Sequence, residues 1–219
     1  MKRKKLVLLA AATLVLLGAV ITYVYAVPPS AKKVPHLLTT TLLADGRYQF
    51  TCMVDTDGES REYFWLTGEK NGESRHVSGR VLGSPLDLYY LDGHIYRYDE
   101  ADQVWYCYDR EDLGQAAQLY AELEPASAFA FKSLIAIDYA GHQKVNGRLG
   151  YKFLITPQAD GWVGEYFTDV TFTVILNRWG GLLGAQVDGK LIEDANTTMT
   201  ALVTFENDGN IKIKAPRTP

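Results

Sequence analysis

The stretch YYLDGHIYRYDEADQVWYCY, residues 89–108, contains seven aromatic side chains in twenty residues. The dipeptide Asp92-Gly93 interrupts it, and Asp-Gly tolerates the positive φ angles that a two-residue hairpin turn requires. The flanking residues are rich in Tyr, Ile, Val and Trp, which favour strands. The stretch and the residues just before it therefore predict three consecutive antiparallel strands, at Leu86–Leu91, His94–Asp99 and Val104–Tyr108.

The register of these strands predicts which side chains share a face of the sheet. Side chains alternate along a strand, so a turn at Asp92-Gly93 and a loop at residues 99–103 place Tyr96 opposite Tyr106 and Arg97 opposite Trp105. We predict that one face turns to the interior and gathers Leu86, Leu88, Tyr90, Ile95, Arg97, Trp105 and Cys107. The other face gathers a tyrosine ladder and one histidine: Tyr89, Tyr96, Tyr98, Tyr106, Tyr108 and His94. A slip of one residue would exchange the faces.

The rest of the chain repeats this pattern of strands and tight turns. Hairpin tips are predicted at Asn71-Gly72, Asp92-Gly93, Asn146-Gly147 and Asp208-Gly209, and further turns at Asp45-Gly46, Asp57-Gly58 and Asp188-Gly189. The additional strands are predicted at Tyr48–Asp55, Arg61–Lys70, Ser74–Leu82, Ile135–Val145, Arg148–Thr156, Val170–Leu176, Leu182–Val187, Thr197–Glu206 and Ile211–Lys214.

Helical segments are few. One is expected at Pro35–Leu43, and another at Asp112–Leu123 that continues past Pro125 to about Leu134. A long sheet with so little helix must curl over the helical pieces to bury one face. The sequence therefore predicts a mainly β (α+β) fold, a curved antiparallel sheet wrapped round a few helices.

The N-terminus is typical of a membrane anchor. Four basic residues precede an uncharged apolar run of 22 residues, Leu6–Val27, which at 1.5 Å per residue would cross a bilayer core about 30 Å thick. The basic flank favours the cytoplasmic side, so we expect a single-pass protein of the cell membrane with its bulk extracytoplasmic. The alternative is a signal peptide cleaved after Ala26. The predicted organisation is an anchor at residues 1–27, a linker at 28–35 and one domain at 36–219.

Charge and cysteine content restrict the partners and the covalent structure. All 26 acidic residues and 18 of the 22 basic residues follow the apolar run, so the exported part has a net charge of −8. This argues against nucleic acid as a partner. Cys52 and Cys107 are the two cysteines. An oxidising exterior permits a disulfide between them, but each also lies in an apolar stretch where a free thiol packs well.

Catalytic and metal-binding patterns are absent from the sequence. The histidines at 36, 76, 94 and 142 lack metal-ligand spacing, and no nucleophile elbow, phosphate loop or HExxH motif occurs. We therefore expect no enzyme activity, no metal and no cofactor. Acidic residues near the opening stretch leave an extracytoplasmic enzyme acting on glycans as a less favoured alternative: Asp99, Glu100, Asp102, Asp109, Glu111 and Asp112.

The order of these segments resembles a known superfamily. After the membrane-targeted N-terminus come a short helix, the hairpin with YYLDGHIYRYDEADQVWYCY, and a helical stretch. YAGHQKVNGRLGYKFLITP and TTMTALVTFENDGNIKIKAP follow. Over most of residues 36–216 this is similar to the bacterial lipoprotein-carrier half-barrels, which include LolA, LolB, LppX, LprG and the sigma-factor regulator RseB. The resemblance implies a half-barrel sheet with an apolar cavity for acyl chains between sheet and helices. This chain departs from the pattern because it has no cysteine for lipid attachment near its anchor, which favours local capture, presentation or sensing over shuttling.

The resemblance and the strand alternation together give a candidate site. The residues predicted to line the cavity are Phe50, Leu88, Tyr90, Ile95, Trp105, Phe153, Phe172 and Val174. By alternation, the same face also receives Tyr48, Val54, Tyr151, Ile155 and Leu176. A plain filled core is the alternative interpretation.

Three classes of function follow. The preferred one is a membrane-anchored module that binds a lipid or another apolar ligand. The second is a non-catalytic envelope sensor or regulatory partner, for which an envelope protein would be the partner. The third is the enzyme. A cavity open to solvent would favour the first, and a filled core with an exposed aromatic patch would favour the second.

Overall fold

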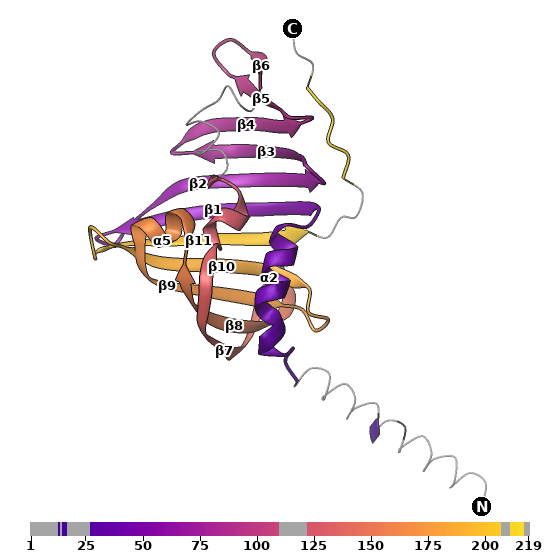
Figure 1. The fold of residues 1–219 in the computed structure, drawn as a ribbon, viewed down its shortest axis with the longest axis vertical. Helices are drawn as coiled ribbons and strands as arrows, with labels where there is room; N and C mark the ends of the chain where they lie inside the picture. The colour runs from indigo at the N-terminus through magenta and orange to yellow at the C-terminus, as the bar shows by residue number, and fades with distance from the viewer. Residues whose placement is uncertain (1–12, 14, 17–26, 110–121, 207–210, 217–219) are drawn as a thin grey trace, which may run out of the picture.

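The computed structural model describes residues 13, 15, 16, 27–109, 122–206 and 211–216. Within them, one eleven-stranded antiparallel sheet has the order β6-β5-β4-β3-β2-β1-β11-β10-β9-β8-β7 (Figure 1). Its strands are β1 Gly46–Thr56, β2 Glu59–Asn71, β3 Ser74–Val81, β4 Ser84–Leu91, β5 His94–Asp99, β6 Val104–Asp109, β7 Phe131–Val145, β8 Arg148–Ala159, β9 Phe167–Leu176, β10 Leu182–Leu191 and β11 Thr197–Glu206.

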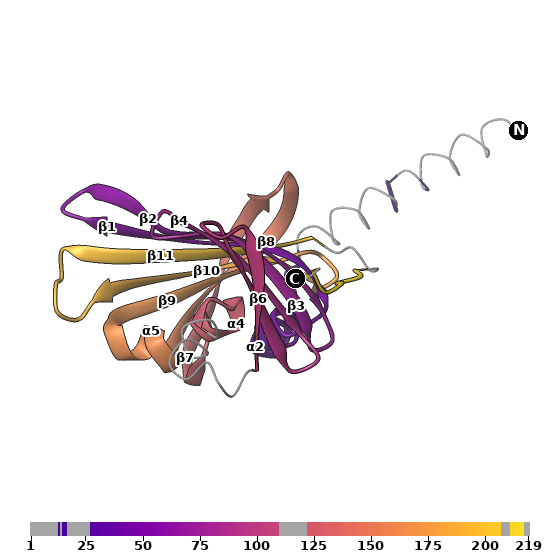
Figure 2. The same ribbon diagram turned by 90° about the horizontal axis from the view of Figure 1, so that it is seen from above.

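The first and last strands, β1 and β11, pair in the middle of the sheet, and β6 and β7 are its two open edges. The 3-10 helix η1 (Ala31–Lys33) leads into α2 (Val34–Leu42), and the other described helices are α4 (Pro125–Ala128) and α5 (Gly161–Tyr166). Figure 2 shows that the sheet arches over α2, α4 and α5. The mainly β prediction and the curved antiparallel sheet are therefore confirmed.

Most predicted turns are where sequence chemistry places them. Asp57-Gly58, Asp92-Gly93 and Asn146-Gly147 all have positive φ and connect adjacent strands. The second hairpin turns one residue later than predicted, at Gly72-Glu73, because Asn71 still pairs with Ser74. Asp208-Gly209 lies outside the described residues.

Two turns differ from the sequence prediction. Leu82-Gly83 connects β3 and β4 with φ angles of 50° and 79°, a backbone that leucine rarely adopts. Asp188-Gly189 is not a turn but lies within β10, at an irregularity in its pairing with β9. A Cβ on Gly189 would lie 3.0 Å from Cβ of Phe167, so the glycine allows a close approach of the two strands there.

The helix predictions hold only near the N-terminus. Pro35–Leu43 is confirmed by α2, whose first residues and η1 occupy the predicted linker at 28–35. Most of Asp112–Leu123 lies outside the described part of the chain. The extension of that helix to Leu134 is wrong, because α4 ends at Ala128 and β7 begins at Phe131.

The C-terminal residues 211–216 lie outside the sheet. The predicted strand Ile211–Lys214 is wrong: residues 211–216 have no strand pairing, although the carbonyl of Ile211 accepts a hydrogen bond of 2.8 Å from Nδ2 of Asn71. Nearly all of Leu6–Val27 lies outside the described residues, and none of the helices that are described is long and apolar enough to cross a membrane.

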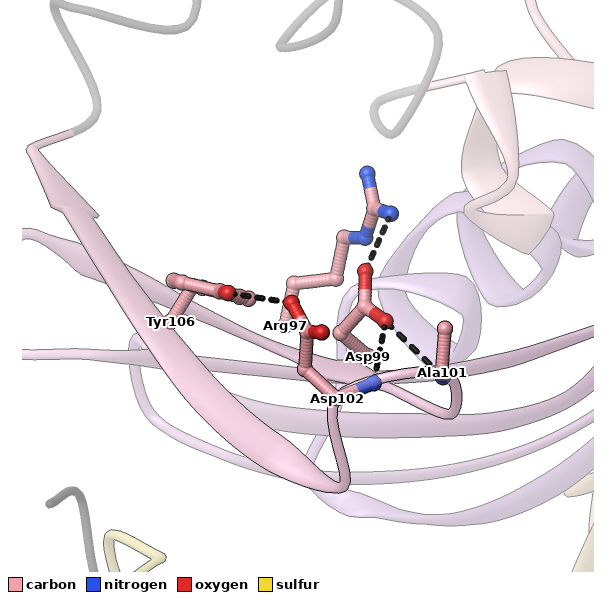
Figure 3. A network of polar contacts seen from close by, with 5 residues as sticks. All are labelled: Arg97, Asp99, Ala101, Asp102 and Tyr106. Atoms are coloured by element: carbon pink, nitrogen blue, oxygen red, sulfur yellow. Dashed lines mark hydrogen bonds and ion pairs between the residues drawn. The ribbon is translucent and has the colours of Figure 1, made fainter.

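The register between β5 and β6 corrects the prediction for the opening stretch. Arg97 pairs with Tyr106 and Tyr98 with Trp105, one residue away from the predicted pairing. The cause is the loop, which begins after Asp99 (Figure 3). Oδ1 of Asp99 accepts hydrogen bonds from the backbone N–H groups of Ala101 and Asp102 at 2.9 and 3.2 Å, and the Tyr106 hydroxyl donates to Oδ2 of Asp102 at 2.6 Å.

This shift of one residue exchanges the faces of β6. Tyr106 and Tyr108 join the face of Ile95, and the prediction that Trp105 and Cys107 lie on that face is wrong. On the opposite, convex face, the ring of Trp105 packs against two tyrosines, Tyr89 and Tyr98, with a centroid separation of 5.2 Å in each case.

Candidate ligand cavity

A cavity of about 780 Å³ lies between the concave face of the sheet and a cover made by α5 and residues 122–123. It occupies the end of the sheet where the β1–β2 tip and α5 lie, drawn on the left in Figure 1. Its lining residues come from strands, turns and helix: Cys52, Val54, Thr56, Asp57, Glu59, Arg61, Glu62, Tyr63, Phe64, Val81, Leu82, Glu122, Leu123, Trp162, Tyr166, Phe167, Leu191, Thr197 and Met199.

Strand alternation builds the floor of the cavity. Cys52 and Val54 are inward residues of β1, and Met199 of β11 lies directly opposite Val54. On the other side of β1, the pairing with β2 shifts after Cys52, so that Val54 pairs with Arg61. This β-bulge brings a charged residue beside an apolar one at the rim.

The cover of the cavity is held together by the Trp162 indole. Nε1 of Trp162 donates a hydrogen bond of 3.1 Å to Oγ of Ser127, and this hydroxyl lies 2.7 Å from the carbonyl oxygens of Glu122 and Glu124. Glu124 also forms an ion pair with Arg75 of β3. The segment before α4 is thus tied both to α5 and to the sheet.

Most charged side chains of the cavity lining are exposed at its rim. Glu59 pairs with Arg61 at 3.1 Å, and Glu62 pairs with Arg80 at 3.4 Å. The rim also contains apolar side chains that are largely in solvent: Tyr63, Tyr166 and Leu82, exposed by 41, 54 and 67 %. An apolar interior with a polar mouth, at this volume, is typical of a small-molecule site.

Cys52 contributes an uncharged thiol to this interior. Burial raises its pKa to about 12, so the thiol is protonated at neutral pH and acts as an apolar group. Cys52 is buried on the concave face and Cys107 is exposed on the convex face, and both are free. Of the two alternatives for the cysteines, the structure therefore has the free thiols and not the Cys52–Cys107 disulfide.

The eight residues predicted to line a cavity lie elsewhere, and none of them lines this one. Trp105 is on the convex face, and Tyr90 packs against the edge of the core. The other six have at most 2 % of their surface exposed and belong to the packed core: Phe50, Leu88, Ile95, Phe153, Phe172 and Val174. Their contact with a ligand remains a prediction.

The helices explain why this part of the face is filled. The rings of Phe129, at the end of α4, and Phe131 pack on Phe172 with centroid separations of 5.4 and 6.4 Å. Val34 and Leu38 of α2 belong to the same buried cluster.

The sequence held only a partial signal for the cavity. Val54 was predicted to point inward, and it does line the cavity. Trp162 and Tyr166 could not be found, because α5 has six residues and shows no helical periodicity.

The described residues contain no group of three or more His, Cys, Asp or Glu side chains placed to hold a metal ion. The cavity lining offers apolar contacts and rim charges, which can bind and orient a ligand. Its one thiol is held in the unreactive protonated form.

Comparison with known proteins supports the fold. No family model and no curated protein matches the sequence. The structure is similar to that of LprF from Mycobacterium bovis, with a TM-score of 0.50 and 9 % identity over 87 % of this chain and 99 % of LprF. This chain therefore shares the half-barrel fold of LprF. The resemblance that its segments suggested is thereby confirmed at the level of the fold.

Two further similarities have lower TM-scores. The lipoprotein LppX of Mycobacterium tuberculosis matches with a TM-score of 0.46 and 10 % identity, over 83 % of this chain and 97 % of LppX. A chain of the Pseudomonas aeruginosa MucA/MucB complex matches with a TM-score of 0.40 and 14 % identity, over 80 % of this chain and 55 % of that chain.

Proposed function

We propose that the protein is a membrane-anchored extracytoplasmic module that binds a lipid or another apolar ligand in the cavity beneath α5. The observation that supports this function is the cavity itself, an apolar space of about 780 Å³ that opens at one end of the sheet. A filled core would have favoured the regulatory alternative. The half-barrel fold shared with LprF is compatible with a binding role, and catalysis has no support from the lining residues.

The energetics favour a guest with an acyl chain. Each methylene transferred from water into the cavity contributes about 0.8 kcal/mol, so a chain of about ten methylenes gains roughly 8 kcal/mol before the costs of binding. The exposed apolar side chains at the rim, Tyr63, Leu82 and Tyr166, extend the contact surface beyond the mouth. A single-chain amphiphile with its headgroup at the rim charges fits this arrangement.

Two measurements test the binding role. Native mass spectrometry of the full-length protein, released from detergent, should show a population that retains a co-purified lipid. In a separate fluorescence titration, that lipid should displace a fluorescent fatty acid from the protein. Val54→Trp fills the cavity from its floor and should abolish both signals while the melting temperature is kept.

The matched control is Leu154→Trp, which adds the same ring on β8 at a position that is 37 % exposed and outside the lining. This variant should bind like the parent protein. A parent protein that neither retains a lipid nor binds the fluorescent fatty acid would refute the proposed function.

The membrane location rests on the length of Leu6–Val27 and on its basic flank. We expect fractionated cells to hold the protein in the membrane, with an intact mass that includes residues 6–27. A soluble protein trimmed after Ala26 would show that the segment is a cleaved signal.

A further inference from the structure

The loop between β9 and β10 presents a tryptophan to solvent on a rigid turn. Trp179 is 79 % exposed, and the guanidinium of Arg178 lies 4.4 Å from the centre of its indole ring. Oδ1 of Asn177 accepts hydrogen bonds from the backbone N–H groups of Trp179 and Gly181 at 2.8 and 2.9 Å. These hydrogen bonds hold the turn, and the exposed indole is therefore available for contact with a surface that the basic side chains around it would attract.

Other basic side chains lie at the same end of the sheet. Tyr151 of β8 pairs with Leu176 of β9, so the β7–β8 tip and the β9–β10 loop are at one end. The tip exposes Lys144, Arg148 and Leu149, the last by 49 %.

The N-terminal helices complete this surface. A Cβ on Gly180 would lie 3.4 Å from Cδ1 of Leu37, so α2 packs beside the β9–β10 loop. η1, which contacts β7, adds two exposed lysines. We call this surface the basic end and define it by Lys32, Lys33, Lys144, Arg148, Arg178 and Trp179.

The charge of the basic end is opposite to that of the protein. Residues 27–44, 139–152 and 177–187 contain basic side chains and no acidic one. Most acidic residues at the same end of the sheet belong to the half formed by β1–β6, for example Asp45, Asp92 and Asp109. The exposed Glu206 at the end of β11, next to β10, marks the boundary of the basic end. In an exported part with a net charge of −8, this local concentration of basic side chains favours a negatively charged partner.

We propose that the basic end docks on the anionic headgroups of a lipid bilayer, with the Trp179 ring seated at the interface. Tryptophan prefers this interface, and lysine and arginine side chains near an anionic leaflet are attracted to it. The apolar run of the sequence ends at Val27, directly before η1, so an anchored chain holds this surface beside its membrane. The inference therefore rests on the proposed membrane location, and it is independent of ligand binding in the cavity.

Docking in this way orients the cavity. β10 begins at Leu182 beside the basic end and finishes at Leu191 in the cavity lining, about 30 Å further along. The mouth of the cavity then faces away from the membrane that anchors the protein, toward whatever delivers or receives the ligand on that side.

Lipid-borne bromine tests the docking through quenching of Trp179 fluorescence. The full-length protein is reconstituted in vesicles of phosphatidylcholine with brominated chains, with or without phosphatidylglycerol. Quenching should be stronger with phosphatidylglycerol, and Trp179→Phe should remove that increment. Lys144→Gln and Arg148→Gln should each lower the docked-to-undocked ratio about fivefold, the effect of one basic residue at an anionic surface.

Lys190→Gln is the matched control, since Lys190 lies at the opposite end of β10 and pairs with Asp169 at 3.0 Å. The Trp179 fluorescence of this variant should be quenched as strongly as that of the parent protein. Quenching that is equal in both vesicles, or unchanged in Trp179→Phe, would overturn the proposal and leave an acidic protein as the partner of this surface. Because the readout follows Trp179, the proposal can succeed or fail whether or not the cavity binds a lipid.

Discussion

The concave face of the sheet is packed where α2 and α4 cover it and hollow where α5 covers it. In the packed region, Phe172 is fully buried and meets the rings of Phe129 and Phe131. In the hollow region, Val54 and Met199 face a cavity of about 780 Å³. Strands β1, β9, β10 and β11 contribute side chains to both regions, so along these strands the difference lies in the cover and not in the sheet.

This comparison shows how one core can serve both stability and binding. The rings that fill the packed region stabilise the sheet, which allows the other region to stay open without collapse. A cavity in the hollow region costs stability because its lining lacks contacts, and a ligand that fills it restores them.

The largest effect should come from the packed region. Phe172→Ala should lower the free energy of unfolding by about 3–5 kcal/mol, because it leaves a void among rings that cannot collapse. Val54→Ala, which only enlarges an existing cavity, should cost about 1 kcal/mol. Urea denaturation of both variants measures the difference, and equal losses would mean that the two regions are packed alike.

Alkaline pH should destabilise the hollow region through Cys52. Its pKa is raised by burial to about 12 in the folded protein, from an ordinary value of 9.0, so the folded state favours the neutral thiol. The resulting stability is present below pH 9 and is lost as pH rises toward 12, by roughly 1 kcal/mol per pH unit.

Cys52→Ala lacks this titration, so the parent and the variant should differ in the pH dependence of unfolding above pH 9. At neutral pH, iodoacetamide should modify the exposed Cys107 and spare Cys52. Parallel stability curves for the two proteins at alkaline pH would contradict the buried, neutral state of the thiol.

A smaller effect is expected from the cover of the cavity. Trp162→Phe removes the hydrogen bond to Ser127 and should cost about 1 kcal/mol in stability and weaken fatty-acid binding. Ser127→Ala removes the same bond, so the double variant should lose less than the sum of the two single losses. Strict additivity would show that the contact does not couple α5 to the segment before α4.

The smallest effect on binding should come from Trp105→Ala, because Trp105 packs on the convex face against Tyr89 and Tyr98. Its affinity for a fluorescent fatty acid, measured by titration, should equal that of the parent protein. Val54→Trp, titrated in parallel, is the variant expected to lose binding. A specific loss of binding with an unchanged melting temperature would show that Trp105 contacts the ligand, as predicted from the sequence.

Much of the fold could be predicted because it follows from local chemistry. Asp92-Gly93 and Asn146-Gly147 fixed two hairpins, and alternation placed Phe50, Phe153 and Val174 on one buried face. The prediction failed for β6 because Asp99 remains in its strand while its side chain caps the loop. The loop is therefore one residue shorter than predicted, and this shift in register exchanges the two faces of β6. The periodicity of the sequence gives no information on loop length.

The sequence predicted the apolar character of the candidate site but not its position. Alternation identifies a concave apolar face, but the volume left above it depends on where short helices settle. α5 has six residues, and the contact of Trp162 with Ser127 joins segments 35 residues apart. No local pattern encodes such a contact, so the filled and hollow regions were indistinguishable before the structure placed their cover.

The central claim is that the hollow region, and not the packed one, holds the ligand. A fatty acid with a photoreactive diazirine on its chain, bound to the full-length protein and irradiated, should attach to peptides that contain Trp162 or Met199 of the cavity lining. The Val54→Trp variant should lose these products. Attachment confined to peptides with Leu88 and Ile95, or none above the level of the Val54→Trp variant, would contradict the account.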